Sequence, residues 1–122
     1  MTRLRIMLVD DNPTVSALLA ELLDVMGHEV CSIETTETGA VAAALRVRPD
    51  LMIVDAYLEQ GSGLSAIDTV LRTTPMPHIF MSGSRLALQK IASTVLYKPF
   101  MADELACAIA EAAPGPANPP FC

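Results

Sequence analysis

Acidic residues follow two of the most apolar segments of the sequence. Asp10 and Asp11 come directly after residues 6–9, and Asp55 comes directly after residues 51–54. Carboxylates that converge repel one another unless a cation lies among them, and hard oxygen ligands of this kind suit Mg²⁺. A Mg²⁺ ion held by two carboxylates keeps open positions that a phosphoryl group can occupy. These residues therefore predict magnesium-assisted phosphoryl chemistry, provided that the fold brings them together.

Two further polar residues occupy equivalent places later in the chain. Ser82 follows the apolar residues 79–81, and Lys98 follows residues 94–97. A hydroxyl and an ammonium group can contact the phosphoryl oxygens that a cation leaves free. No hydroxyl–base or thiol–imidazole pair accompanies them, so the best available nucleophile is a carboxylate. The chemistry that this set of residues indicates is acceptance of a phosphoryl group by an aspartate.

Alternating strand and helix patterns predict the scaffold for these residues. Apolar blocks of strand length predict strands at residues 6–9, 29–33, 51–54, 79–81 and 94–97. Helical patterns occupy residues 13–26, 36–47, 64–71 and 102–112, and a short helix is expected around residues 86–91. This order predicts an α/β fold, a doubly wound five-stranded parallel sheet with helices on both faces. Ligands of such sheets bind beyond the carboxyl ends of the strands, which is where the five polar residues stand.

The helices carry recognisable caps and apolar stripes. Asn12 and Thr36 are expected to cap the first two helices, and Gly27 to end the first in a left-handed conformation. One apolar stripe of the first helix comprises Val15, Leu18, Leu19, Leu22, Leu23 and Met26, and one face of the third carries Leu64, Ile67, Val70 and Leu71.

A length of 122 residues with 52% hydrophobic residues predicts one domain, which we place at residues 1–113. Residues 114–122 contain four of the nine prolines, so we expect a disordered tail. Because Met1 lies so close to the first strand, a protein consisting of this domain alone is expected.

The charge and apolar patterns exclude several classes of partner. The formal net charge is −6 and the eight basic residues are scattered, which argues against nucleic-acid binding. No apolar run approaches the ~20 residues of a membrane span, and the first apolar run is too short for a signal peptide. Cys31 and Cys107 are predicted to be small buried residues, and Cys122 an exposed thiol that could link two chains. We therefore expect a cytoplasmic protein that contacts neither membrane nor nucleic acid.

Four short motifs together resemble the receiver domain of two-component response regulators. They are Val9-Asp10-Asp11, Val54-Asp55, Met81-Ser82-Gly83 and Leu96-Tyr97-Lys98-Pro99-Phe100. The resemblance covers residues 4 to about 113 and implies the flavodoxin-like strand order 2-1-3-4-5. It also implies a signalling role, in which a histidine kinase or histidine phosphotransfer protein phosphorylates Asp55 and a conformational change follows. Such a domain catalyses only its own phosphoryl transfer and the hydrolysis of its aspartyl phosphate.

The resemblance also assigns roles within the site. Asp55 is the phosphoacceptor, Asp11 contacts Mg²⁺ together with Asp55, and Asp10 contacts it largely through water. The third protein ligand is the main-chain carbonyl of Tyr57. Ser82 and Lys98 hold phosphoryl oxygens, the Lys98–Pro99 peptide is cis, and Gly63 matches a glycine that ends the loop after the phosphoacceptor strand.

Two departures from the family affect the expected readout. Val95 stands where the family usually has an aromatic switch residue, and Lys98 follows Ser82 by only 16 positions, which shortens the fourth helix. Tyr97 shares a strand face with Val95 and is predicted to take over the switch role together with Ser82. A partner kinase is expected to dock on the first helix and the loop after the fifth strand, at Thr14, Val15, Leu18, Phe100 and Met101.

Two alternatives belong to other classes of protein. A phosphatase with an aspartate nucleophile needs a second carboxylate two residues later, whereas Asn12 and Tyr57 occupy these places. A binding module of receiver fold that works without phosphorylation is favoured by Val95 and the shortened helix, and opposed by the intact acceptor residues.

Overall fold

The five strands of the structure form one parallel sheet in the order β2-β1-β3-β4-β5. The structure is a computed structural model, which describes residues 3–84, 93–113 and 122. The strands are β1 (Arg5–Val9), β2 (Glu29–Glu34), β3 (Leu51–Asp55), β4 (His78–Ser82) and β5 (Thr94–Tyr97). The helices are α1 (Pro13–Val25), α2 (Glu37–Val47), α3 (Gly63–Leu71) and α4 (Ala102–Ala112). The predicted fold class and strand order are confirmed.

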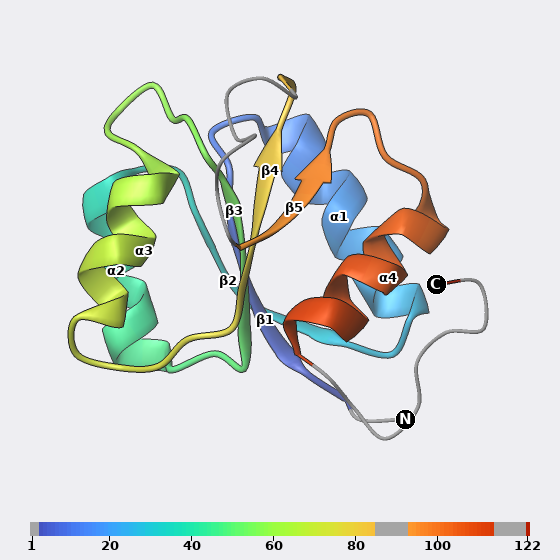
Figure 1. The fold of residues 1–122 in the computed structure, drawn as a ribbon, viewed down its shortest axis with the longest axis horizontal. Helices are drawn as coiled ribbons and strands as arrows, with labels where there is room; N and C mark the ends of the chain where they lie inside the picture. The colour runs from blue at the N-terminus through green and yellow to red at the C-terminus, as the bar shows by residue number, and fades with distance from the viewer. Residues whose placement is uncertain (1–2, 85–92, 114–121) are drawn as a thin grey trace.

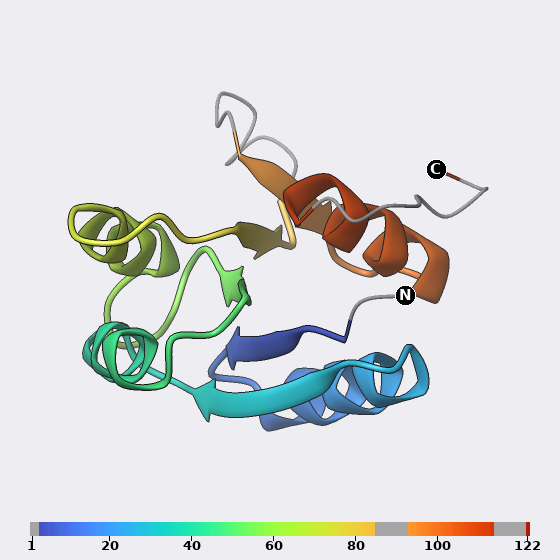
Figure 2. The same ribbon diagram turned by 90° about the horizontal axis from the view of Figure 1, so that it is seen from below.

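The helices cover the sheet in two layers, with α2 and α3 on one face and α1 and α4 on the other (Figures 1 and 2). Successive strand residues enter opposite cores because side chains alternate along a strand. On the α2–α3 side the strands contribute Met7, Val9, Met52, Val54 and Phe80. On the α1–α4 side they contribute Ile6, Leu8, Leu51, Ile53, Ile79 and Met81. Burial of both faces explains why β1, β3 and β4 appear in the sequence as largely apolar blocks, whereas the edge strand β2 has no fully buried residue.

The predicted helix starts are confirmed. The Asn12 side-chain oxygen accepts hydrogen bonds from the main-chain N–H groups of Thr14 and Val15. Thr36 Oγ1 accepts one from Gly39 N at 3.0 Å. These side chains satisfy N–H groups that the first turn of a helix leaves unpaired. Gly27, two residues after α1, has a positive φ of 89°, which glycine adopts without strain.

The apolar stripes predicted for α1 and α3 include residues that the structure leaves exposed. Leu19 and Leu23 of α1 are fully buried, whereas Leu18 is 53% exposed. In α3, Ile67 and Val70 are buried but Leu71 is exposed. Both exposed leucines border the buried stripe, where spacing alone does not distinguish a core residue from a surface residue.

The cysteines differ from the prediction. Cys107 on α4 is half-buried and forms a disulfide with the exposed Cys122, so Cys107 is not a fully buried residue and Cys122 is not a free thiol. A separation of 15 residues fits no short motif, so the sequence alone gave no sign of the pairing. Cys31 is free and half-buried, and burial raises the pKa of its thiol. The expectation of a cytoplasmic protein rested partly on the absence of disulfides, so it loses part of its basis and stays a prediction.

Two predictions fall wholly or mostly outside the described residues. They are the short helix around residues 86–91 and the disordered tail at residues 114–122, of which only Cys122 is described. The boundary of the domain at residue 113 also stays a prediction. In the part of the chain that is described, no helix combines the length and the apolar character that a membrane span requires.

Candidate functional site

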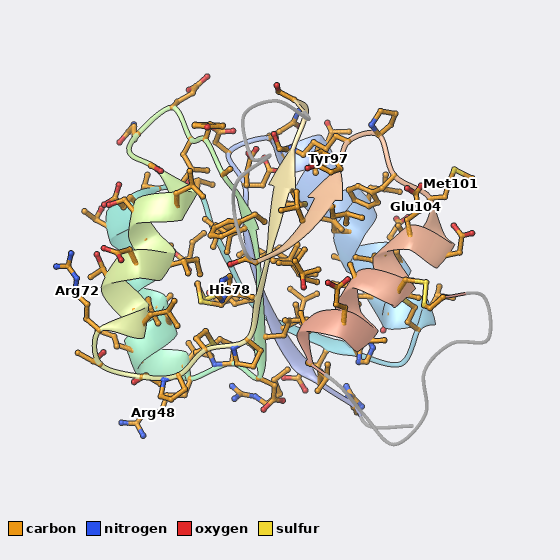
Figure 3. The ribbon with its side chains drawn as sticks, in the orientation of Figure 1. Arg48, Arg72, His78, Tyr97, Met101 and Glu104 are labelled. Carbon is orange, nitrogen blue, oxygen red and sulfur yellow. A yellow bond between two sulfur atoms is a disulfide. The ribbon has the colours of Figure 1, made fainter. Side chains whose placement is uncertain are left out.

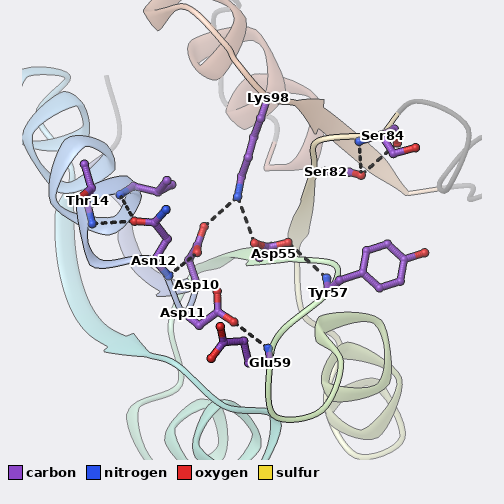
Figure 4. Close-up of polar contacts among 11 residues, drawn as sticks. Asp10, Asp11, Asn12, Thr14, Asp55, Tyr57, Glu59, Ser82, Ser84 and Lys98 are labelled. Atoms are coloured by element: carbon purple, nitrogen blue, oxygen red, sulfur yellow. Dashed lines mark hydrogen bonds and ion pairs between the residues drawn. The ribbon is translucent and has the colours of Figure 1, made fainter.

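Three carboxylates meet where β1 and β3 end (Figure 4). Val9 pairs with Val54 in the sheet, so the residues that follow β1 lie beside Asp55, the last residue of β3. One carboxylate oxygen from each of Asp10, Asp11 and Asp55 lies within 4.8 Å of the other two. The structure thus brings together the three acidic residues that the sequence singled out.

Lys98 reaches this cluster from the end of β5. Its Nζ lies 3.1 Å from Asp10 Oδ2 and 3.0 Å from Asp55 Oδ2. Burial alone lowers the pKa of this ammonium group, but its hydrogen bonds with Asp55 and Asp10 and the negative charge of both carboxylates together outweigh that effect and raise the pKa. The Lys98–Pro99 peptide is cis, as the resemblance implied. Lys98 is therefore a fixed positive charge between two carboxylates.

Main-chain donors hold each carboxylate in place. Asp10 is 1% exposed, and its Oδ1 accepts a hydrogen bond from Asn12 N at 2.8 Å. Asp11 Oδ2 accepts one from Glu59 N at 2.7 Å, and Asp55 Oδ1 accepts one from Tyr57 N at 3.2 Å. A buried carboxylate needs such partners, because desolvation of an unpaired charge is costly. The cluster is thus fixed in position by the loops that follow β1 and β3.

Ser82 stands at the same edge of the sheet but bonds elsewhere. It ends β4, next to β3, and is only 2% exposed. Its Oγ donates to Ser84 O and accepts from Ser84 N, both at 3.0 Å. Figure 4 shows Ser82 and Ser84 paired apart from the contacts around Lys98. The predicted residue is in the expected place, but its hydroxyl is satisfied within its own loop.

The loop between β3 and α3 packs tightly on Asp55. A Cβ atom at Gly63 would collide with the main-chain carbonyl oxygen of Asp55, and it would lie 2.6 Å from Val54 Cγ1. Gly63 N also donates to Ala56 O at 3.1 Å, which closes the loop on itself. Only glycine fits this approach, which explains the match at Gly63. The ring of Tyr57 is 53% exposed and points away from Asp55 (Figure 4).

Of the predicted switch residues, Ser82 ends β4, whereas Val95 and Tyr97 lie on β5. Val95 packs against the core on the α2–α3 side, and Leu96 packs on the opposite side. Tyr97 is half-buried near the end of β5 (Figure 3), where it pairs with Ser82 in the sheet. This pairing places Tyr97 beside the hydroxyl residue, whereas its predicted role in switching stays a prediction.

The predicted docking residues divide into exposed and packed members. Thr14 is exposed, as is Leu18, and Met101 is 70% exposed. Val15 and Phe100 are partly buried against the α1–α4 core. Of these five residues, only Thr14, Leu18 and Met101 are therefore exposed enough for direct contact with a partner, and their role in docking stays a prediction.

Sequence reasoning missed two contributors to the site. One is the main-chain N–H of Glu59, which bonds Asp11 and which no residue type could have revealed. The other is Glu37 at the start of α2, whose side chain bonds the loop that follows Asp55. An acidic residue in the first turn of a helix is common, so its presence gave no distinctive signal.

Comparison with known proteins agrees with this geometry. A model of the response regulator receiver domain matches residues 6–110. The phyllosphere-induced regulator PhyR of Methylorubrum extorquens is 35% identical over 79 residues, covering 63% of this chain and 30% of the relative. The nitrogen assimilation regulatory protein NtrX of Azorhizobium caulinodans is 34% identical over 110 residues, covering 82% of this chain and 24% of the relative.

The fold is likewise similar to a solved structure. The response regulator PhyR from Brucella abortus superposes with a TM-score of 0.83 at 26% identity, covering 92% of this chain and 48% of that chain. This chain therefore spans less than a third of the two curated relatives and about half of the crystal structure. The family match extends over most of the chain, and the protein belongs to the family of response regulator receiver domains.

Proposed function

We propose that this domain accepts a phosphoryl group on Asp55 and signals through the resulting change at β4 and β5. The observation that carries the proposal is Lys98 Nζ, held 3.0 Å from Asp55 Oδ2 and 3.1 Å from Asp10 Oδ2. A half-buried lysine between carboxylates supplies positive charge where a phosphoryl group would bring negative charge. Asp55 is also more accessible than the buried Asp10, as an acceptor must be.

The acidic cluster fits Mg²⁺. Its three carboxylates offer hard oxygen ligands within 4.8 Å of one another, and the exposed side of the site leaves room for water. Asp11 and Asp55 would bind the ion directly, Asp10 largely through water, and the Tyr57 carbonyl would complete the protein ligands. When bound, Mg²⁺ supplies positive charge that offsets the charge on the phosphoryl oxygens.

The phosphodonor is a phosphohistidine of a kinase or of a phosphotransfer protein. An Asp55 oxygen forms a bond to phosphorus as the phosphorus–nitrogen bond breaks, and the donor nitrogen keeps the electron pair of that bond. Lys98 stabilises the new group through one of its oxygens. The Ser82 hydroxyl gives up its two hydrogen bonds with Ser84 and donates to another phosphoryl oxygen. This change of partner moves the end of β4. The domain turns over no other substrate.

The donor protein approaches over an exposed patch beside the site. The exposed residues Thr14 and Leu18 of α1 and Met101 after β5 would form this patch, and Val15 and Phe100 pack against the α1–α4 core. Leu18→Glu and Met101→Glu should slow phosphorylation by a cognate histidine kinase while leaving phosphorylation by acetyl phosphate unchanged. Equal rates with the kinase would remove the patch from the proposal.

The readout passes from Ser82 to its sheet neighbour Tyr97. Phosphorylation adds about −1.5 to −2 charge at the end of the sheet, to which Ser82 and Lys98 respond first. Val95 packs in the core and offers no polar atom for this response. The output partner is another protein that distinguishes the two states. A receiver of fixed conformation is the second candidate, favoured by Val95 at the usual switch position.

The test is phosphorylation by acetyl phosphate in Mg²⁺, followed by intact-mass spectrometry. The wild-type chain should gain one phosphoryl group, and Asp55→Asn should gain none. A phosphoryl group that appears equally in Asp55→Asn would overturn the assignment. A wild-type chain that stays unmodified would favour the second candidate.

A further inference from the structure

The first turn of α2 is attached to the loop that follows Asp55. Glu37 Oε1 accepts a hydrogen bond from Ser62 N at 2.8 Å, and its Oε2 accepts one from Ser65 Oγ at 2.8 Å. The main-chain N–H of Glu37 donates to Gln60 O at 3.1 Å. One residue of α2 therefore holds the end of this loop and the start of α3 through three hydrogen bonds.

The loop also packs directly on the Glu37 side chain. Gly61 has a positive φ of 94°, and a Cβ atom placed there would overlap the Glu37 Cβ. The missing side chain lets the loop backbone approach the stem of Glu37 closely. Main-chain and side-chain contacts of Glu37 thus fix the three loop residues 60–62, which directly precede α3.

The other end of this loop contacts the acidic cluster. Glu59 N donates to Asp11 Oδ2 at 2.7 Å, and Tyr57 N donates to Asp55 Oδ1 at 3.2 Å. Glu59 directly precedes Gln60, whose carbonyl Glu37 binds. A shift of the loop away from Glu37 would therefore move the donor that orients Asp11.

We propose that Glu37 is a positioning residue of the phosphoacceptor site. Its carboxylate receives two charge-assisted hydrogen bonds, which are stronger than those between neutral groups. By holding the loop, it keeps the Glu59 N–H on Asp11 and fixes the orientation of that carboxylate. The consequence for Mg²⁺ and phosphorylation rests on the proposed function, whereas the effect on the loop does not.

The chain offers a matched control in Glu34. This residue ends β2 and is half-buried like Glu37, but its side-chain Oε2 accepts a hydrogen bond from Ser32 Oγ in its own strand. Its main-chain oxygen accepts from Asp10 N, so it lies next to the site. Glu34→Ala and Glu37→Ala therefore remove the same charge beside the site, and only the second releases the loop.

The deciding measurement is amide hydrogen exchange at Glu59 in the protein without metal. Glu37→Ala should speed this exchange about tenfold, the equivalent of one net hydrogen bond, and Ser65→Ala about threefold. Glu34→Ala should leave it within about twofold of wild type. Glu37→Gln, which retains a carbonyl acceptor, should lie between wild type and Glu37→Ala. Exchange at Glu59 that is the same in Glu37→Ala and Glu34→Ala would overturn the proposal, as would Glu37→Gln being as fast as Glu37→Ala.

A second measurement separates this inference from the proposed function. In a Mg²⁺ titration, Glu37→Ala should bind the ion roughly threefold to tenfold more weakly than Glu34→Ala. This loss of affinity is at or below the lower limit usual when a residue that hydrogen-bonds a metal ligand is removed. Equal Mg²⁺ affinities of the two variants would overturn the positioning role even if the exchange rates differ. A wild-type chain that binds no Mg²⁺ would instead contradict the proposed function, and the exchange at Glu59 would still decide the role of Glu37 in the loop. Thermal unfolding of each variant verifies that it is folded.

Discussion

The two halves of the functional edge of the sheet are organised differently. On one side, Lys98 joins Asp10 and Asp55 through hydrogen bonds of 3.1 and 3.0 Å. On the other side, the Ser82 hydroxyl forms two hydrogen bonds with Ser84 in its own loop. The charged half is therefore already assembled for chemistry, whereas the hydroxyl half has to exchange bonds before it can contact Asp55. Charge pairing across strands therefore fixes the acceptor, whereas a local turn leaves the responding residue able to change partners.

The strongest way to break this comparison is to remove the lysine that assembles the charged half. Lys98→Met should slow phosphorylation by acetyl phosphate about a hundredfold at saturating Mg²⁺, since loss of one stabilising group at such a centre has effects of this size. The control is Arg72→Met, which removes the same charge from an exposed ion pair with Asp68 on α3. A rate for Lys98→Met that matches the control would show that Lys98 does not act on the phosphoryl group.

A smaller effect is expected when the support beneath Asp55 is changed. Gly63→Ala places a Cβ atom against the Asp55 carbonyl oxygen and should lower the free energy of unfolding by about 1–3 kcal/mol, as overpacking does. Gly83→Ala is the matched control, because a Cβ atom there meets nothing within 4 Å. Urea unfolding of both variants measures the difference. Equal stabilities would contradict the close packing that positions Asp55.

The carboxylates themselves should differ in their effects on Mg²⁺. Asp11→Asn should weaken binding of the ion about tenfold or more, and Asp10→Asn should weaken it less, because of these two residues only Asp11 is proposed to contact the ion directly. Ser82→Ala should leave the affinity unchanged, since its hydroxyl bonds Ser84. Titration of the three variants ranks these effects. If Asp10→Asn were the more damaging, the proposed ligand set would be wrong.

The smallest predicted effect concerns a histidine just before β2, at the opposite end of the sheet. Burial lowers the pKa of His28 below 6.5, and its Nδ1 accepts a hydrogen bond from Leu4 N at 3.1 Å, which requires an unprotonated nitrogen. Below pH 6.5 the unfolded chain therefore binds this proton more readily than the folded one. The free energy of unfolding should fall as the pH is lowered through this range, and His28→Gln should lessen that fall. Unfolding curves at about pH 8 and about pH 5.5 measure it, and an identical pH dependence in both proteins would contradict the assignment.

Much of this molecule was predictable because its sequence follows local physical rules. The blocks around Ile6 and Leu51 are apolar on both faces of the sheet, and Asn12 and Thr36 cap helices through their own side chains. The parallel order then placed Asp10, Asp11, Asp55 and Lys98 at one edge.

What could not be predicted depends on contacts between distant segments. Leu18 is exposed because it lies beyond the edge of the buried stripe of α1. The disulfide joins Cys107 and Cys122, which are 15 residues apart in the sequence. The direction of the Ser82 hydroxyl and the contact of Glu37 with Ser62 are set by loop conformations. None of these features has a signature in residue type or spacing.

The most direct test of the account is to locate the phosphoryl group among the three neighbouring carboxylates. After treatment with acetyl phosphate and Mg²⁺, borohydride reduction converts an aspartyl phosphate into homoserine, which peptide mass spectrometry can place in the sequence. If Asp55 is the acceptor, homoserine should appear at position 55, with Asp10 and Asp11 unchanged. Homoserine at position 10 or 11, or its absence from position 55 in a chain that has gained a phosphoryl group, would contradict it.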